Sequence, residues 1–147
     1  MPRLSKAAAQ ERKARIVALA EKRFVQNGYE QTTVDEIVKE IGLAKGTYYY
    51  HFDSKEDLMI AVSEKLILET STKLNAVYNR RDKDIVWRIR NVLKTYQDDF
   101  YRNKGIWRQV YHWRNAMLYH RVAHISAQRF TPILEDLLAD ASREGKV

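Results

Sequence analysis

The segment spanning residues 32–52 constrains the fold of this 147-residue chain more than any other part of it. Its first half carries apolar residues at the spacing of one helical face: Val34, Ile37, Val38 and Ile41. Gly42 follows, and glycine takes the left-handed conformation that often ends a helix. A second short helix is expected from about Ala44 to Phe52. Two helices this short cannot bury their own apolar faces, so they must pack on a third, and the tight turn predicts a helix-turn-helix.

The second short helix divides its side chains between two faces. At about 100° per residue, Tyr48 and Phe52 fall on one side. The other side carries Lys45, Gly46, Tyr49 and Tyr50, and Thr47 and His51 lie on its flanks. A cation, phenol hydroxyls and a glycine that lets the backbone come close suit phosphates and base edges. The alternative is an ordinary solvated face, but three successive tyrosines and a histidine are unusual on such a face.

Two helix-start signals flank this region. Thr33 and Glu36 have the spacing of a capping box, which leaves the amide end of the first short helix available to a phosphate. Ser54 begins a second start signal, with Lys55 in the first turn of the helix that follows. A lysine there is unfavourable beside the helix dipole unless a phosphate lies nearby, although an ordinary exposed lysine remains the alternative.

Three motifs in this part of the chain carry a family resemblance: GYEQTTV at residues 28–34, IGLAKGTYYYHF at 41–52 and SKEDL at 54–58. Together they resemble the N-terminal domain of the TetR family of transcriptional regulators, over about residues 10–60. The resemblance implies an all-helical homodimer, usually a repressor, with a three-helix DNA-binding head and a helical ligand-binding body.

Carried over by position, the resemblance assigns roles to single residues. It makes Thr33 a phosphate contact. Candidates for base contact are Lys45, Gly46, Thr47 and Tyr49, and candidates for holding the DNA backbone are Tyr50, His51 and Lys55. Tyr48 and Phe52 belong to the core of the head.

The chain before residue 28 supplies the third helix of the head. Residues 8–27 carry apolar side chains at helical spacing, Ile16, Leu19, Ala20 and Phe24, and Gly28 ends this helix. The short basic segment at residues 2–6 is either a disordered tail or an arm that reaches the minor groove. We therefore expect an arm and DNA-binding domain over residues 1–53, and a linking helix and body over residues 54–147.

The pattern after residue 53 is helical throughout, so the fold class is all-α. A long helix is expected over residues 54–79. Its inward apolar stripe consists of Leu58, Ala61, Val62 and Leu66, and Ile67 and Leu68 widen this stripe. Residues 80–83 break it, and the next inward stripe consists of Ile85, Ile89, Val92, Leu93, Tyr96 and Phe100. Another helix is expected from Ile106 to about His120. The last begins after Arg121, restarts or kinks at Thr131 and Pro132, and ends at Gly145.

The net charge of +7 does not come from the predicted head. Residues 1–60 contain 10 Lys and Arg against 9 Asp and Glu, whereas residues 73–129 contain 13 against 4. A basic body attracts nucleic acid without sequence preference, and it equally suits an anionic effector. The absence of cysteine, of a signal-peptide pattern and of any run of 18 apolar residues argues against a disulfide scaffold or a membrane protein, which leaves the cytoplasm as the expected location.

Aromatic residues concentrate in the body. Such rings can fill a small helical core, but Tyr and Trp each carry a polar atom that needs a partner when buried, as a ligand cavity provides. With the arginines among them, they predict a pocket for a small organic effector, aromatic or anionic. The candidate pocket residues are Trp87, Tyr96, Phe100, Trp107, Arg108, Tyr111, Trp113, Arg114 and Tyr119.

Signals for catalysis are poor. The chain has no nucleophile motif, no glycine-rich phosphate loop and no cysteine-based metal site. His120 and His124 stand four residues apart on a probable helix, with His112 about two turns earlier. No carboxylate accompanies them between Trp107 and Phe130, so we interpret them as surface or pocket histidines rather than metal ligands. We expect neither an enzyme nor a cofactor.

Assembly is the point at which the chain departs from the family pattern. Members usually continue for two more helices, which form the dimer interface, beyond the position of Gly145. Either this chain is shortened, or it dimerises through its last helices, with Leu134, Leu137 and Leu138 as candidates.

Taken together, the sequence predicts a repressor released from a palindromic operator by an effector, through a swing of the head on the linking helix. The alternative is a shortened partner that forms mixed dimers with a full-length regulator.

Overall fold

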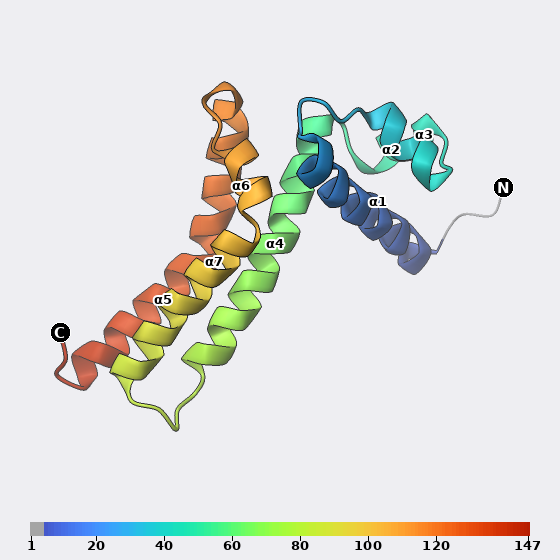
Figure 1. Cartoon of the computed structure of the whole chain (residues 1–147). Coiled ribbons are helices and arrows are strands. Elements are labelled where there is room, and N and C mark those ends of the chain that lie inside the picture. Colours follow the sequence, from blue (N-terminus) through green and yellow to red (C-terminus); the bar gives the residue numbers. More distant parts are fainter. Residues whose placement is uncertain (1–4) are drawn as a thin grey trace. The chain divides into compact units, whose positions relative to one another are not determined.

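The structure is a computed structural model that describes residues 5–147, except for the side chain of Trp113. Its helices are α1 (Lys6–Asn27), α2 (Val34–Ile41), α3 (Lys45–His51), α4 (Lys55–Tyr78), α5 (Ile85–Arg102), α6 (Lys104–Val110) and α7 (Ala116–Arg143), with a 3₁₀ turn at Trp113–Asn115 (Figure 1). Residues 5–147 contain no strand, so the all-α prediction is confirmed. They form two compact units, a head and a body, that divide within α4 after Ser63.

The head begins with α1, which starts two residues before the helix predicted over residues 8–27 and ends where that prediction ends. Ser5 caps this helix by accepting a hydrogen bond from the Ala8 amide at 3.2 Å, and Lys6 is its first residue, so only residues 2–4 of the expected arm lie outside the described residues. Gly28 ends α1 with φ of 89°. Ile16, Ala20 and Phe24 are fully buried in the head core, whereas Leu19, also expected to face inward, is half-buried.

The body is built from the remainder of α4 together with α5, α6 and α7. One apolar cluster draws its buried residues from three of these helices: Leu74, Ile85, Val92, Ile133, Leu137 and Ala141. Leu137 is only 4% exposed in this core, so its proposed place in a dimer interface is wrong, while Leu134 and Leu138 remain exposed. Leu68, Leu93 and Tyr96 are also exposed, contrary to the inward positions predicted for them. The apolar stripes predicted for these helices are wider than the surface that the core covers.

The second half of the body departs most from the sequence prediction. The helix expected from Ile106 to about His120 ends at Val110. His112 then caps the 3₁₀ turn, with its Nδ1 accepting from the Arg114 amide at 3.3 Å, and the Asn115 side chain donates to the Gln109 carbonyl at 2.9 Å. These side chains satisfy backbone groups at the break, so the chain stops one helix and starts another without a glycine or proline.

The last helix starts earlier than predicted and is continuous. It runs from Ala116 to Arg143, with Pro132 inside it, so a start after Arg121 and a restart at Pro132 are both wrong. Proline removes one intrahelical hydrogen bond, whose acceptor is the carbonyl of Gln128. Pro132 and Gln128 are exposed, so water can take the place of the missing donor.

Two buried carboxylates join the helices of the body. Asp140 on α7 is 5% exposed and accepts from the Arg88 guanidinium at 2.9 Å and from Arg81 at 2.5 Å, with Arg143 as a third partner. Asp99 on α5 accepts from Lys73 on α4 at 2.8 Å. Within residues 5–147, no helix is both long and apolar enough to cross a membrane, and no three potential metal-binding side chains gather at one place.

Candidate nucleic-acid interface

The start of α2 is fixed by its own side chains. The Thr33 hydroxyl accepts from the Glu36 amide at 3.2 Å, and the Glu36 carboxylate accepts from the Thr33 amide at 3.1 Å. This is the capping box that the sequence predicted, and it is now confirmed. Thr33 itself is exposed, so the capped end of α2 faces solvent.

The turn between α2 and α3 is made by a left-handed glycine. Gly42 has φ of 79°, and its amide and that of Leu43 both donate to the Val38 carbonyl, at 3.0 and 2.9 Å. A side chain at this φ would be strained, so the sequence requires glycine here. Arg23 on α1 donates through Nε to Glu40 on α2 at 2.7 Å, which ties the first helix of the head to the second.

The inner face of α3 anchors it to the head core. Tyr48 is fully buried and Phe52 is 4% exposed, as predicted, and their ring centroids lie 5.4 Å apart. The Tyr48 hydroxyl donates to the Ser54 carbonyl at 2.8 Å. Burial raises the pKa of Tyr48 well above its ordinary value, so this hydroxyl keeps its proton and remains a donor. The anchor therefore fixes both the rotation of α3 and the start of α4.

The outer face of α3 is exposed. Tyr49 is 47% and Tyr50 77% exposed, and Lys45 is also exposed, while Thr47 is half-buried at the edge. The Lys45 ammonium lies 2.9 Å from Asp35 on α2, and this hydrogen bond raises the pKa of Lys45. An ion pair exposed to this degree contributes little to stability, so Lys45 can exchange Asp35 for a phosphate at small cost.

Gly46 has no structural reason to be glycine. No atom outside its own helical surroundings lies within 4 Å of the place a Cβ would occupy, and its φ is not positive. Glycine in a helix is less stable than alanine by about 0.5 to 1 kcal/mol. A bare backbone at the exposed start of α3 is instead what close approach by another molecule would need.

His51 and Lys55, predicted to hold the DNA backbone, are less accessible than the tyrosines. The Nε2 atom of His51 is buried and has no hydrogen-bond partner among the described residues. Burial, followed by the charges of Arg12 and Lys13, lowers the pKa of His51, so its ring is neutral at pH 7. Lys55 donates to the Tyr29 carbonyl at 2.8 Å and lies 4.4 Å from the Tyr29 ring centroid.

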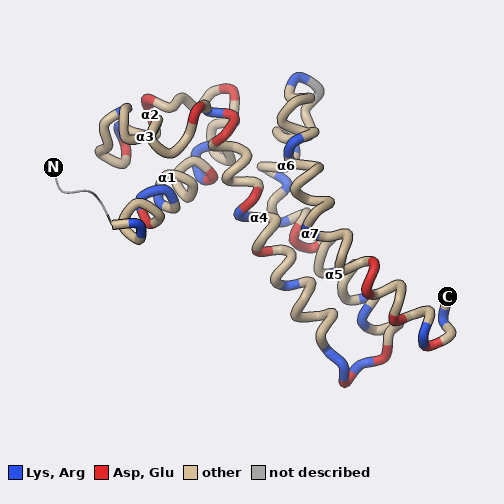
Figure 2. Tube along the Cα trace, turned by 180° about the vertical axis from the view of Figure 1, so that it is seen from behind, with Lys and Arg blue, Asp and Glu red and all other residues tan. Residues whose placement is uncertain are grey.

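Two cations of α1 were missed by the sequence reasoning. Lys13 lies 5.5 Å from the centroid of the Phe52 ring, and both Arg12 and Lys13 act on His51 at the end of α3. They bring positive charge from α1 to the α3 surface, and Figure 2 shows basic residues spread along α1. The only sequence signal is the basic run at residues 12–15, which by itself looks like an ordinary exposed face.

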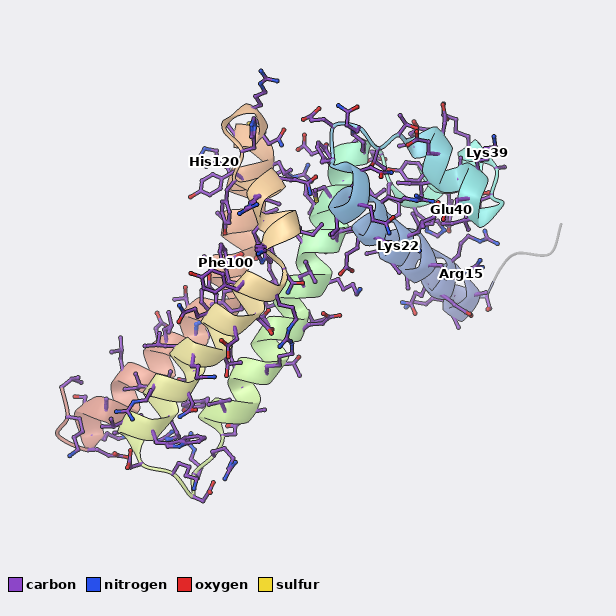
Figure 3. All side chains as sticks on the ribbon, viewed as in Figure 1. Arg15, Lys22, Lys39, Glu40, Phe100 and His120 are labelled. Atoms are coloured by element: carbon purple, nitrogen blue, oxygen red, sulfur yellow. The ribbon has the colours of Figure 1, made fainter. Side chains whose placement is uncertain are left out.

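The predicted effector residues of the body fall into separate groups. Four of them line a cavity of about 20 Å³ beside Ile67, Thr70, Ser126 and Phe130: Tyr96, Phe100, Trp107 and Tyr111. Phe100, labelled in Figure 3, lies on α5 with its ring 6.5 Å from that of Trp107. The Tyr119 ring contacts that of Tyr111 at 5.5 Å. The structure thus brings together five of the nine predicted residues.

The other predicted pocket residues lie elsewhere. Trp87 is flanked by Arg80 and Lys83, each with its charge 5.7 Å from the ring centroid, at the basic turn between α4 and α5 seen in Figure 2. Arg108 and Arg114 are exposed and line neither this cavity nor a second one described below, and the side chain of Trp113 lies outside the described residues.

A second, larger cavity was not predicted. It has a volume of about 300 Å³ and is lined by Leu74, Val92, Leu93, Tyr96, Phe130, Ile133 and Leu134. Apart from Tyr96 and Phe130 these are aliphatic residues, and the sequence pattern assigned Val92 and Leu93 to the core and Leu134 to an interface. Their separation along the chain left no signal that they enclose a space.

An α2–α3 pair joined by a tight glycine turn, with a polar outer face and an inner face packed in a helical head, defines a helix-turn-helix domain. Comparison with known proteins agrees. Residues 16–62 match the family described as bacterial regulatory proteins, tetR family. The N-terminal domain of this chain therefore belongs to the TetR family, and the resemblance noted from the sequence is confirmed.

Individual relatives extend the match. The transcriptional regulator QacR of Staphylococcus aureus is 27% identical over 109 residues, which cover 64% of this chain and 58% of QacR, so the match spans less than two thirds of that relative. A TetR/AcrR-family regulator from Thermobifida fusca superposes with a TM-score of 0.73 at 25% identity, covering 93% of this chain and 73% of the other. FadR from Bacillus subtilis, solved in complex with stearoyl-CoA, superposes with a TM-score of 0.75 at 20% identity, covering 91% and 73%. That likeness shows the fold alone.

Proposed function

We propose that this protein is a transcriptional repressor that binds a palindromic operator as a homodimer in the cytoplasm and is released by a small organic effector. The observation that carries the proposal is the outer face of α3, which exposes Lys45, Gly46, Tyr49 and Tyr50 while Tyr48 and Phe52 hold the helix in the head core. The fold itself has no use for a bare glycine and two exposed tyrosines at this place.

The proposed DNA contacts divide by accessibility. Lys45, Gly46, Thr47 and Tyr49 meet base edges in the major groove, and Tyr50 and Thr33 meet phosphates on either side. His51 and Lys55 act mainly by positioning neighbouring groups. Lys55 joins the start of α4 to the Tyr29 carbonyl, and the neutral ring of His51 contacts Tyr50, with ring centroids 5.0 Å apart. Arg12 and Lys13 add positive potential from α1.

Release by an effector is the second part of the proposal. The body contains cavities next to a cluster of aromatic residues, and its relatives include regulators such as QacR and, by fold, FadR with bound stearoyl-CoA. An effector can act only if it binds one conformation of the dimer more tightly than the other. Two heads read a palindrome when they are spaced by about 34 to 36 Å, one turn of DNA, so an effector that disfavours this spacing weakens binding.

The experiment that tests the function is selection of bound duplexes from a random pool at moderate salt, with the mass of the protein in solution recorded in parallel. We expect a palindromic consensus and the mass of a dimer. Binding without a consensus would contradict sequence-specific regulation, and a consensus bound by a monomer would contradict the homodimer. A Tyr49→Ala variant provides the matched control, since it should fold normally and enrich the consensus less.

A further inference from the structure

One pair of rings separates the two cavities of the body. Tyr96 and Phe130 line both cavities, and their rings meet edge to face with centroids 5.5 Å apart and planes at 84°. The cavity on one side holds about 20 Å³ and the one on the other about 300 Å³. The two spaces are therefore neighbours that share these two side chains as a wall.

The small cavity fits a single hydrogen-bonding group. About 20 Å³ is enough for one water-sized group. The lining residues that carry hydroxyl groups are Thr70, Tyr96, Tyr111 and Ser126, and burial raises the pKa of Tyr111, so its phenol stays neutral. A polar group of a ligand would find partners here that the larger cavity lacks.

Thr70 decides which kind of polar group is favoured. Its hydroxyl donates to the buried Asp99 carboxylate at 3.1 Å, so the Thr70 oxygen has only lone pairs left to offer to the cavity. Thr70 is 6% and Asp99 3% exposed, so this arrangement is shielded from water. Lys73 and Arg102 already neutralise Asp99, at 2.8 and 3.2 Å. The wall therefore favours a neutral donor over a carboxylate, and it gives an ammonium no free counter-charge.

The large cavity is apolar and open at one side. No Lys, Arg, Asp or Glu lines either cavity, so a charged ligand would lose its hydration without gaining a partner. Leu93 and Leu134, at 57% and 46% exposed, form the open side, and Leu74 and Val92 lie inside. At about 300 Å³ this cavity is much larger than the small cavity, and it has room for a medium-length alkyl chain.

We infer that the body binds a neutral amphiphile with one hydroxyl end and a medium-length alkyl chain. The hydroxyl donates to Thr70 in the small cavity and the chain fills the large cavity. The rings of Tyr96 and Phe130, which contact each other in the free protein, move apart to let the chain connect the two. This inference rests on the proposed function only in taking the ligand as the effector. It departs from the aromatic or anionic effector predicted from the sequence, because Arg108 and Arg114 do not reach either cavity lining.

The first experiment compares head groups and chain lengths by calorimetry on the DNA-free protein. The probes are primary alcohols from butanol to octanol, with octanoate and octylammonium as charged partners. We expect affinity to rise about fourfold per methylene, from the hydrophobic contribution of each group, and octanol to bind at least about tenfold more tightly than either ion. Tighter binding of octanoate, or affinity independent of chain length, would overturn the inference.

Matched variants test each end of the site. Thr70→Val should weaken octanol binding by about tenfold, whereas Thr70→Ser, which keeps the hydroxyl, should bind octanol as the wild-type protein does. Thr72→Val, on the exposed side of α4, should leave octanol binding unchanged. Leu134→Trp, which fills the large cavity, should abolish the dependence on chain length, whereas Leu138→Trp, one turn further on α7 and outside the lining, should preserve it. Equal effects within either pair would overturn the placement.

Two further readouts separate this inference from the function on which it rests. Octanol that binds with the expected variant pattern but does not release the selected duplex supports the inference and contradicts alcohol-driven release. A protein that binds its duplex but no alcohol contradicts the inference alone. The mass in solution identifies a competing occupant: if Leu134→Trp dissociates a dimer without changing octanol affinity, a second copy of the chain covers the large cavity and the inference fails.

Discussion

The head and the body treat their charged side chains in opposite ways. None of the described residues of the head buries a charged side chain, whereas the body buries Arg88, Asp99 and Asp140. The head keeps its ions in exposed pairs such as Lys45 with Asp35. An exposed pair is worth about 0 to 1 kcal/mol and can change partner, but separating a buried pair strands a charge. The exposed charges of the head can therefore pair with the phosphates of a nucleic acid, whereas the buried charges of the body hold its helices together.

The largest effect should come from breaking a buried pair in the body. Asp140→Ala leaves Arg88, 3% exposed, without its closest carboxylate, and we expect the free energy of unfolding to fall by about 3 to 5 kcal/mol. Urea unfolding followed by circular dichroism measures it. Asp98→Ala is the control, because Asp98 pairs with Lys94 in the open, and it should cost less than about 1 kcal/mol. Similar losses in both variants would remove the contrast between buried and exposed ion pairs on which the comparison of head and body rests.

The next effect concerns DNA binding without loss of fold. Tyr49→Ala should cost about 1 to 3 kcal/mol of operator binding while the unfolding free energy stays within about 0.5 kcal/mol. Phe52→Ala, only three residues later, should instead destabilise the head by about 3 to 5 kcal/mol. Binding titrations and urea unfolding of both variants check the two faces of α3. Matching losses of stability in the two would show that the face assignment is wrong.

A smaller effect tests how α3 is anchored. Tyr48→Phe removes the hydrogen bond to the Ser54 carbonyl but keeps the ring, so we expect a loss of about 0.5 to 1.5 kcal/mol in the unfolding free energy. Tyr50→Phe, on the exposed face, should leave stability unchanged. Thermal unfolding resolves the difference, and an unaffected Tyr48→Phe variant would show that the buried hydroxyl does not stabilise the anchor.

The smallest expected effect is a pH dependence in the head. The pKa of His51 is lowered in the folded protein, so the unfolded chain binds the proton more readily. Its contribution to stability is therefore complete above about pH 6.5, the ordinary value, and is lost as the pH falls. Unfolding free energies at pH 7.5 and 5.5 should differ more in the wild-type protein than in His51→Asn. An equal pH dependence would mean that His51 is free to protonate.

The same contrast explains what the sequence could predict. The head follows from signals within a few residues of one another: the Thr33 and Glu36 pair, and Gly42 at the turn. The cavities of the body need Thr70, Tyr96 and Phe130, which come from three helices and meet only after packing. The break at His112 was missed because side chains cap it in place of glycine or proline, and Leu137 was misassigned because an apolar helix residue suits a core and an interface equally.

The role proposed for α3 is tested most directly by Gly46→Ala, with stability and DNA affinity measured on the same preparation. The added methyl group meets no atom within 4 Å beyond its own helical surroundings, so the unfolding free energy should be unchanged or higher by up to about 1 kcal/mol. Affinity for the selected duplex should fall by at least about tenfold, because the backbone can no longer approach the DNA closely. Full stability together with unchanged affinity would contradict the assignment of this face to DNA.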